Sequence, residues 1–190
     1  MPFPLRSPRM LIEPLSAADV EDFVGYRRDP EVARYQSWDV DYSEADARKL
    51  VAGQPDATLP GPGRWLQLAV RSTNAPILYG DVAVHRLADQ PHTFEVGVTF
   101  ARRHQGRGYA TEALERLLAH LFDQDAHRIV ASCDARNTAV ASLLRRVGLR
   151  LESHQVEADF FKGGWTDLDG YAILAREYQQ AHRRPGPLLA

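Results

Sequence analysis

The sequence predicts a mixed α/β fold with a parallel strand pair at the centre of a mixed sheet. Three segments with strand-like alternation precede a glycine-rich turn at residues 105–110. An amphipathic helix follows the turn, and then come a buried-strand run, a second helix and two more strands. A strand–helix–strand unit makes its two strands parallel, so the glycine-led helix is expected to pack across that pair.

The chain of 190 residues is expected to form a single domain, 1–190, with flexible tails at about residues 1–8 and 181–190. Its formal net charge of −2 disfavours a nucleic-acid partner, and no apolar run approaches the ~20 residues of a membrane span. The single cysteine, Cys133, rules out an internal disulfide and favours a cytoplasmic location. The seven histidines lack metal-ligand spacing, so no metal is expected.

The N-terminal half predicts strands and helices in alternation. A strand over residues 9–15 leads to a helix that Ser16 and Asp19 cap and that ends before Pro30. A second helix runs from Ser43 to Gly53 and is followed by a loop rich in proline and glycine. Alternation then predicts strands over residues 64–71, 77–87 and 93–100.

The last of these strands has two distinct faces. Phe94, Val96, Val98 and Phe100 share one face, and Glu95, Gly97 and Thr99 share the other. In the C-terminal half, the glycine-led helix starts near residue 108 and a buried strand covers residues 127–134. Asn137 caps the next helix, which ends near Gly148, and two strands over residues 149–161 and 169–177 form a hairpin turned at residues 162–165.

The glycine end of the central helix suits an anion. The first N–H groups of a helix lack partners within it, and the helix dipole adds about half a positive charge there. Glycines let a phosphate approach the backbone closely, and Arg102, Arg103 and Arg107 add positive charge. A plain strand–helix turn explains the glycines equally well, and neither a Walker loop nor a GxGxxG fingerprint is present.

Segments along nearly the whole chain resemble the GNAT acetyltransferase superfamily and its RimJ/RimL-like branch. QGRGYA, residues 105–110, is similar to the Q/R-x-x-G-x-G/A signature that holds the pyrophosphate of acetyl-CoA. The resemblance implies a central mixed, mostly antiparallel sheet with a splayed parallel pair and helices on both faces. Arg102 stands where the branch often has proline. Further matching segments are residues 9–15, 29–35, 94–114, 134–149 and 160–177.

The resemblance implies acetyl-CoA (coenzyme A) as cosubstrate and places its binding residues. The pantetheine arm would bond to the backbone of Val98 and Phe100, where that strand splays from residues 127–133. Asn137 would reach the arm, and it can also be a simple helix cap. The expected cofactor-binding residues are Val98, Phe100, Gln105, Gly106, Arg107, Gly108, Tyr109, Ala110 and Asn137.

Direct acetyl transfer through a ternary complex needs a base for the acceptor amine. Glu95 lies on the polar face of the strand that carries the pantetheine site, and Asp159 aligns with a carboxylate proposed as base in RimL-like enzymes. Each can instead be a solvated or salt-bridged strand carboxylate, and a water relay can replace either. Val140 and Leu144 stand where relatives carry the serine or tyrosine proton donor, so the thiolate is expected to leave without a side-chain acid.

Aromatic side chains next to carboxylates are expected to bind the acceptor, a primary amine that is either a small molecule or a protein N-terminus. In the RimJ/RimL-like branch, the N-terminal helices and the last hairpin form the wall of the acceptor site. The same side chains can serve core or loop packing. The candidates are Tyr35, Trp38, His85, Phe161 and Trp165. A homodimer is a family-level expectation.

Other classes of function stay open. A coenzyme A-binding sensor or interaction module with little turnover is favoured by the missing proton donor, whereas Glu95 and Asp159 favour an enzyme. A plain nucleotide-binding domain ranks last, because the chain lacks a Walker lysine and an acidic ribose clamp. Cys133 has no histidine at a readable activating distance, so a buried packing residue is expected there instead of a nucleophile.

Overall fold

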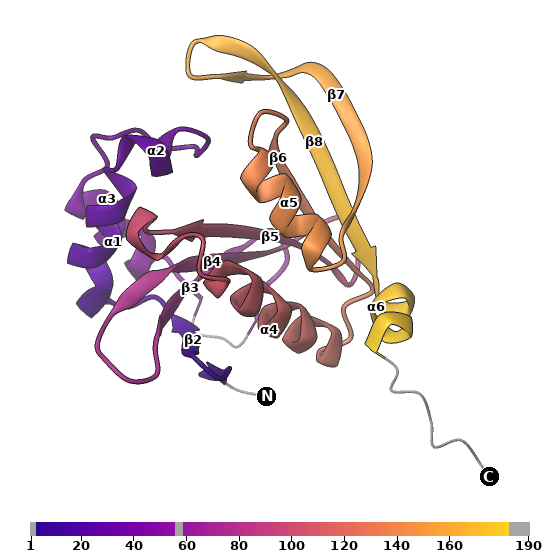
Figure 1. The fold of residues 1–190 in the computed structure, drawn as a ribbon, viewed down its shortest axis with the longest axis horizontal. Coiled ribbons are helices and arrows are strands. Elements are labelled where there is room, and N and C mark those ends of the chain that lie inside the picture. Colours follow the sequence, from indigo (N-terminus) through magenta and orange to yellow (C-terminus); the bar gives the residue numbers. More distant parts are fainter. Residues whose placement is uncertain (1–2, 56–58, 183–190) are drawn as a thin grey trace.

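The computed structural model describes residues 3–55 and 59–182, and its centre is an eight-stranded sheet (Figure 1). The strand order is β1-β2-β3-β4-β5-β6-β8-β7, and every neighbouring pair is antiparallel except β5–β6. The predicted mixed, mostly antiparallel sheet is confirmed. The strands are β1 (Leu5–Arg6), β2 (Met10–Pro14), β3 (Trp65–Ser72), β4 (Leu78–Arg86), β5 (Thr93–Phe100), β6 (Arg128–Asp134), β7 (Arg150–Phe161) and β8 (Gly164–Leu174).

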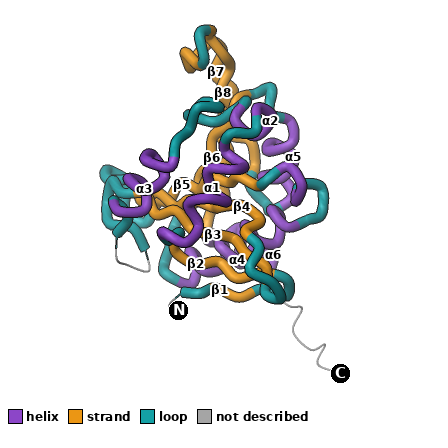
Figure 2. The backbone as a smooth tube through the Cα atoms, turned by 90° about the vertical axis from the view of Figure 1, so that its left-hand side faces the viewer, coloured by secondary structure: helices purple, strands orange, loops and turns teal. Residues whose placement is uncertain are grey.

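Helices cover both faces of the sheet, as expected. Helix α1 lies in front of the strands in Figure 2, and the β7–β8 hairpin projects beyond the body at the top. Helices α4 and α5 pack on the opposite face. The helices are α1 (Val20–Arg27), α2 (Pro30–Ala33), α3 (Glu44–Ala52), α4 (Tyr109–Asp123), α5 (Thr138–Arg146) and α6 (Ala175–His182), and short 3₁₀ turns lie at Ala17–Asp19 and Arg102–His104.

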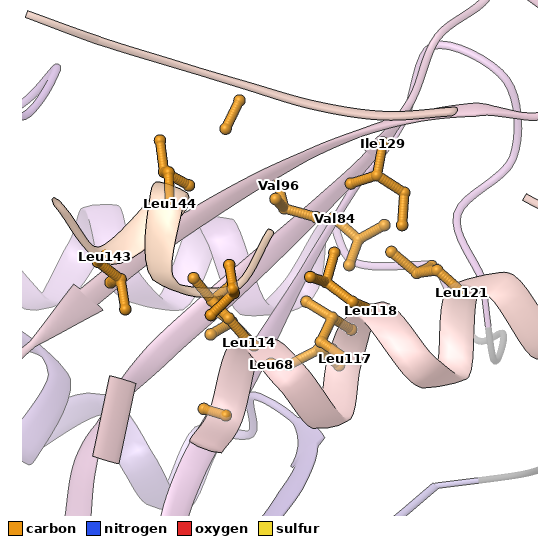
Figure 3. Packing of buried hydrophobic residues seen from close by; sticks show 14 of the residues in the cluster. Leu68, Val84, Val96, Leu114, Leu117, Leu118, Leu121, Ile129, Leu143 and Leu144 are labelled. Carbon is orange, nitrogen blue, oxygen red and sulfur yellow. The ribbon is translucent and has the colours of Figure 1, made fainter. Parts of the chain in front are cut away.

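The main core lies between α4, α5 and the sheet. The predicted stripe of α4 is buried against side chains of β3, β4 and β5, because residues spaced by three and four positions share one helix face (Figure 3). A second cluster, around Phe23 and Leu78, packs α1 on the other face. The side chains labelled in Figure 3 are Leu68, Val84, Val96, Leu114, Leu117, Leu118, Leu121, Ile129, Leu143 and Leu144.

The predicted helix caps are confirmed by their hydrogen bonds. Ser16 and Asp19 form a capping box, and Ser43 forms another with Asp46. The Asn137 side chain accepts from the backbone N–H of Val140 at 3.2 Å, which satisfies one free donor at the start of α5.

Helix α1 ends at Arg27, before Pro30, as predicted. The chain then forms the short helix α2, because the Asp29 side chain caps it and Pro30 occupies its first position. Two other local predictions need correction. Residues 175–177 begin α6 and do not continue the last strand. The hairpin turns at Lys162 and Gly163 alone, both with positive φ, so residues 164–165 belong to β8.

Parts of the two expected tails lie in regular structure. Residues 5–6 form β1, and α6 extends to residue 182. The remaining tail residues 1–2 and 183–190 lie outside the described residues.

The parallel pair β5–β6 is short, and this positions the site. Its paired residues are only Thr93–Glu95 with Arg128–Val130. Beyond Glu95 and Val130 the two strands separate, so the edge of β5 that faces β6 has no strand partner. An unpaired strand edge presents free N–H and C=O groups to a ligand.

Candidate active site

A cleft of about 510 Å³ follows the unpaired edge of β5. Its walls are the end of β5, the glycine turn, the first turns of α4 and α5, and α2 with the residues after it. Nine of its lining residues come from the sequence prediction: Val98, Phe100, Gln105, Gly106, Gly108, Tyr109, Ala110, Asn137 and Tyr35.

The glycine turn has the geometry of an anion cradle. Gly106 and Gly108 have φ angles of 72° and 77°, a left-handed conformation that other residues adopt at a cost. Gly108 is the N-cap of the 15-residue helix α4, whose first N–H groups point back at the turn. A Cβ added at Gly106 would meet no atom within 4 Å, so space is open above the turn. These features fit a diphosphate held by backbone N–H groups.

Arg9, the residue directly before β2, contacts both the glycine turn and α4. Its Nη1 donates to the carbonyl oxygen of Arg107 at 3.0 Å, and its Nε lies 2.6 Å from a carboxylate oxygen of Glu112 on α4. Partial burial raises the pKa of Glu112, but hydrogen bonds from Ser7 and Arg9 and the charge of Arg9 outweigh it and hold that pKa below its ordinary value. Neither Arg9 nor Glu112 carries a local sequence signal for this role.

Cations surround the mouth of the cradle. Arg102, Arg103 and Arg107 are exposed next to it. Arg146 of α5, which the sequence did not single out, lines the cleft, and its Nη1 donates to the Thr111 hydroxyl at 3.4 Å. This arrangement favours an anionic ligand by charge as well as by the helix dipole.

Two aromatic residues of the turn serve packing. The Tyr109 ring stacks on Tyr79 with centroids 4.4 Å apart, and Arg9 lies over its other face at 4.6 Å. Partial burial, aided by the charges of Arg103 and Arg107, lowers the pKa of His104. His104 is therefore neutral at pH 7 and adds no charge to the cradle.

The predicted pantetheine edge is open and held in shape. The Gln105 side chain donates to the carbonyl oxygen of Phe100 at 2.8 Å, which fixes the turn to the end of β5. Asn137 lines the cleft from the opposite side while its Oδ1 caps α5. Its amide nitrogen is not part of that cap, so capping and ligand contact are compatible.

Glu95 lies where the parallel strands part. Glu95 is the last residue of β5 that pairs with β6. One carboxylate oxygen lies 3.4 Å from Nδ1 of His85 on β4, and the other accepts from the hydroxyl of Ser132 on β6 at 3.4 Å. The Glu95 side chain is 28% exposed and reaches solvent, but it is not one of the residues that line the cleft.

The other predicted residues lie around this centre at different depths. Asp159 lies in the outer part of the hairpin, opposite Thr166, and does not line the cleft. Trp38 stacks on the buried Arg27 guanidinium at 3.6 Å and donates to the Arg27 carbonyl at 3.2 Å. Trp165 packs edge-on against Phe160, and both are 62% exposed. Phe161 lies at the hairpin end, with the Lys162 ammonium 5.4 Å from its ring centre.

Val140 and Leu144 stand at the two positions where relatives carry a proton donor, and both side chains are apolar. Val140 lines the cleft, and Leu144 is 2% exposed within the core. Burial, with the charges of Asp169 and Asp134, raises the pKa of the Cys133 thiol to about 11. Cys133 is therefore protonated at neutral pH, as expected of a packing residue.

Within residues 3–55 and 59–182, no group of three or more histidine, cysteine, aspartate or glutamate side chains has the geometry to hold a metal ion. No helix in the same part of the chain is both long and apolar enough to cross a membrane.

Comparison with known proteins identifies the family and the fold. The family model of the acetyltransferase (GNAT) domain matches residues 9–150. The chain belongs to this family, and its enzyme class is that of the acetyl-CoA-dependent N-acetyltransferases. It is 25% identical to an uncharacterized N-acetyltransferase, p20, of Bacillus licheniformis over 92% of this chain and 97% of the relative. It is 27% identical to the ribosomal-protein-serine acetyltransferase of Escherichia coli over 70% and 72% of the two chains.

Solved acetyltransferase structures have the same fold as this chain. A GNAT-family acetyltransferase from Bacillus anthracis superposes with a TM-score of 0.81 and 28% identity, covering 90% of this chain and 98% of that one. The spermidine N-acetyltransferase of Vibrio cholerae, solved with CoA and spermine, gives a TM-score of 0.78 at 20% identity and covers 90% and 99%. At that identity the second match supports the fold alone.

Proposed function

We propose that the chain transfers the acetyl group of acetyl-CoA directly to a primary amine, either a small molecule or a protein N-terminus, through a ternary complex. The observation that carries the proposal is the pair of left-handed glycines at the start of α4, next to the unpaired edge of β5. The relatives support an amine acceptor, because their names describe acetyl transfer to a ribosomal protein and to spermidine.

Different parts of the chain bind different parts of acetyl-CoA in this proposal. The backbone of residues 105–110 holds the diphosphate, with Arg107 and Arg146 supplying positive charge. The edge of β5 at Val98 and Phe100 bonds the pantetheine arm as an added strand. Acetyl-CoA supplies the thioester that makes the acetyl group transferable.

Glu95 is the base of the proposed reaction. It lies where the unpaired edge of β5 begins, and its carboxylate is held between His85 and Ser132. It removes a proton from the acceptor ammonium, since only the neutral amine has the lone pair for attack. Asp159 is farther out on the hairpin, where a carboxylate suits attraction of the cationic acceptor.

No side-chain acid is assigned to the leaving thiolate. The side chains of Val140 and Leu144 have no acidic proton to donate. A thiol has a pKa of about 8.5, so the thiolate is a fair leaving group without protonation. The acceptor enters between the α2 side and the hairpin. Tyr35 is its contact within the cleft, and Trp38, His85, Phe161 and Trp165 are the further aromatic candidates.

Gly106→Asp and Gly106→Asn form a matched pair that tests this function. Both side chains tolerate left-handed backbone better than others do, and a Cβ at this position has open space. Only aspartate adds a negative charge where the diphosphate binds. Calorimetric titration is expected to show acetyl-CoA affinity at least about tenfold weaker for Gly106→Asp than for Gly106→Asn.

Thiol release against a panel of amines and peptides, in the same preparations, completes the test. Amine-dependent release by the wild-type chain supports the transferase and names the acceptor class. Equal acetyl-CoA affinity in the two variants contradicts the cradle. Tight binding without release on any amine would favour a coenzyme A-binding sensor.

A further inference from the structure

His85 is paired with Glu95 by the sheet itself. The two residues are direct partners in the antiparallel β4–β5 register, so their side chains leave the same face of the sheet next to each other. Nδ1 of His85 lies 3.4 Å from a carboxylate oxygen of Glu95. A separation of this size in a free enzyme closes to a hydrogen bond with a small side-chain movement.

Trp65 covers the other side of the His85 ring. Trp65 is the register partner of His85 on β3, and the two rings stack with centroids 4.7 Å apart and planes 11° from parallel. Trp65 is 46% exposed and lines a second cavity of about 810 Å³, between β3 and α3. The three side chains therefore form a row across neighbouring strands, from Glu95 to this second cavity.

The contacts of His85 determine where it can pass a proton. Its own side chain is 20% exposed, so the ring reaches water as well as Glu95. Among the described residues, Glu95 is the one ionisable group in hydrogen-bond or ion-pair contact with it. Arg86 follows it on β4 and points to the opposite face, while Arg64, before Trp65, donates to the carbonyl of Gly53.

Two further neighbours of the row are uncharged side chains, while Asp39, Asp41, Asp46 and Lys49 line the cavity beyond Trp65. Gln67, on the same face of β3 as Trp65, donates its amide to Asp81, and Ser132 of β6 meets Glu95 through a hydroxyl. With these partners, His85 has one acidic contact on one side and a route to water on the other. An imidazole ring can accept a proton at one ring nitrogen and release one from the other.

We propose that His85 carries the proton from Glu95 to solvent and thereby regenerates the base after each turnover. This rests on the proposed role of Glu95. The acceptor ammonium gives its proton to the Glu95 carboxylate and becomes the neutral amine. The Glu95 carboxyl then gives that proton to Nδ1 of the neutral ring. The ring loses its Nε2 proton to water or buffer, and tautomer exchange with solvent restores the starting form.

The experiment compares His85→Gln, His85→Ala and the control His127→Gln. Glutamine keeps a polar contact with Glu95 but cannot carry a proton, while alanine leaves a slot under Trp65 for a free imidazole. His127 is exposed and outside the site. Steady-state kinetics with an identified acceptor are expected to show kcat lowered about tenfold or more in both His85 variants in dilute buffer. KM for acetyl-CoA and its calorimetric affinity stay unchanged.

Added imidazole is expected to restore kcat in His85→Ala, and His127→Gln behaves as wild type. A His85→Gln variant with wild-type kcat in dilute buffer would overturn the relay, because a residue that only positions Glu95 tolerates glutamine. Failure of imidazole to raise kcat in His85→Ala would overturn it too.

Glu95→Gln separates the two proposals. If that variant keeps full activity, Glu95 is not the base, and the proposed mechanism and the relay both fall. If Glu95→Gln is inactive while His85→Gln is fully active, only the relay falls. In the free protein, the ¹⁵N resonance of His85 Nδ1 is expected to change on Glu95→Gln, and an unchanged resonance contradicts the contact on which the relay depends.

Discussion

The Lys162 ammonium, at the turn of the β7–β8 hairpin, lies 2.9 Å from a carboxylate oxygen of Asp39 in the segment between α2 and α3. The same nitrogen donates to the carbonyl oxygens of Ala33 and Trp38, both at 2.8 Å. Figure 1 shows the orange and yellow hairpin arching above the body on the side of α2. One ammonium thus joins the two walls between which the acceptor is proposed to enter.

Lys162→Ala is expected to loosen these walls. Three contacts to one charged group are lost, and hydrogen bonds to charged groups contribute about 1.5–3 kcal/mol each when well formed. The β7–β8 hairpin projects beyond the body of the sheet at this point (Figure 1). Amide hydrogen exchange is expected to accelerate in residues 33–39 and 159–166, and KM for the acceptor to rise several-fold while KM for acetyl-CoA stays constant.

Arg48→Ala is the matched control for this prediction. It removes an exposed ion pair with Glu44 on α3, whose contribution is expected to be about 0.3–0.5 kcal/mol. Exchange in the hairpin should not respond to it. Unchanged exchange in Lys162→Ala, or an equal rise in both KM values, would show that the hairpin does not depend on this contact.

Tyr26→Phe is expected to destabilise the chain by about 1–3 kcal/mol. The Tyr26 hydroxyl donates to the Asp81 carboxylate, which lies 1% exposed between α1 and the sheet and also accepts from Gln67. Burial raises the pKa of Asp81, and Arg27 and these donors offset only part of the rise. Removing one donor leaves a buried oxygen short of a partner, and urea unfolding measures the cost.

Tyr178→Phe provides the comparison. The Tyr178 ring stacks on Phe122, and its hydroxyl donates no hydrogen bond within residues 3–55 and 59–182. Its free energy of unfolding should stay within about 0.5 kcal/mol of wild type. A loss as large as that of Tyr26→Phe would assign the effect to removal of any tyrosine hydroxyl and not to the buried hydrogen bond.

Periodicity and capping chemistry made most of the fold predictable. The α4 stripe, the two faces of β5, and the caps at Ser43 and Asn137 all depend on residues a few positions apart, and all are confirmed. The glycine turn was predictable for the same reason, because left-handed glycines before a helix are a local signal. The family resemblance added the separation of β5 from β6, which no local pattern encodes.

The parts that sequence reasoning missed are tertiary contacts. Arg9 and Glu112 are 103 positions apart, and Lys162 lies 129 positions from Ala33. No spacing rule links such residues, so their roles appear only once the strands are paired. Helix α6 was missed because residues 171–177 continue an apolar strand pattern, and the Glu177 carboxylate ends that strand by accepting from the N–H of Leu174.

Glu112→Gln is expected to weaken both stability and acetyl-CoA binding. Glutamine keeps the shape but loses the charge that holds Arg9 against the Arg107 carbonyl. The pKa of Glu112 is lower in the folded chain than in the unfolded one, so its contribution is fully present above the unfolded value of about 4.3. The contribution is lost as pH falls through the folded value.

Urea unfolding of the wild-type chain and of Glu112→Gln, from neutral pH down to about pH 3, tests this pH dependence of the free energy of unfolding. The gap between wild type and Glu112→Gln should be about 1–2 kcal/mol at neutral pH and should shrink on the acid side. Glu44→Gln, on an exposed pair, serves as control. A gap that grows as pH falls would contradict the lowered pKa.

Gly80→Ala is expected to disturb the cofactor edge through the strand behind it. A Cβ at Gly80 would lie 2.2 Å from the carbonyl oxygen of Thr99 and 2.6 Å from Cα of Phe100, and neither backbone atom can move without shifting the end of β5. We expect a destabilisation of about 2–4 kcal/mol and weaker acetyl-CoA binding.

Gly97→Ala, on β5 itself, distinguishes this effect from a general loss of glycine. Its Cβ would lie 3.6 Å from Cβ of Ala83, an ordinary contact. Urea unfolding and calorimetric titration should therefore find Gly97→Ala close to wild type. If Gly80→Ala binds acetyl-CoA as tightly as Gly97→Ala, the position of β5 at Phe100 does not control the cofactor site. A loss confined to Gly80→Ala means that close packing of β4 against β5 holds the binding edge in place.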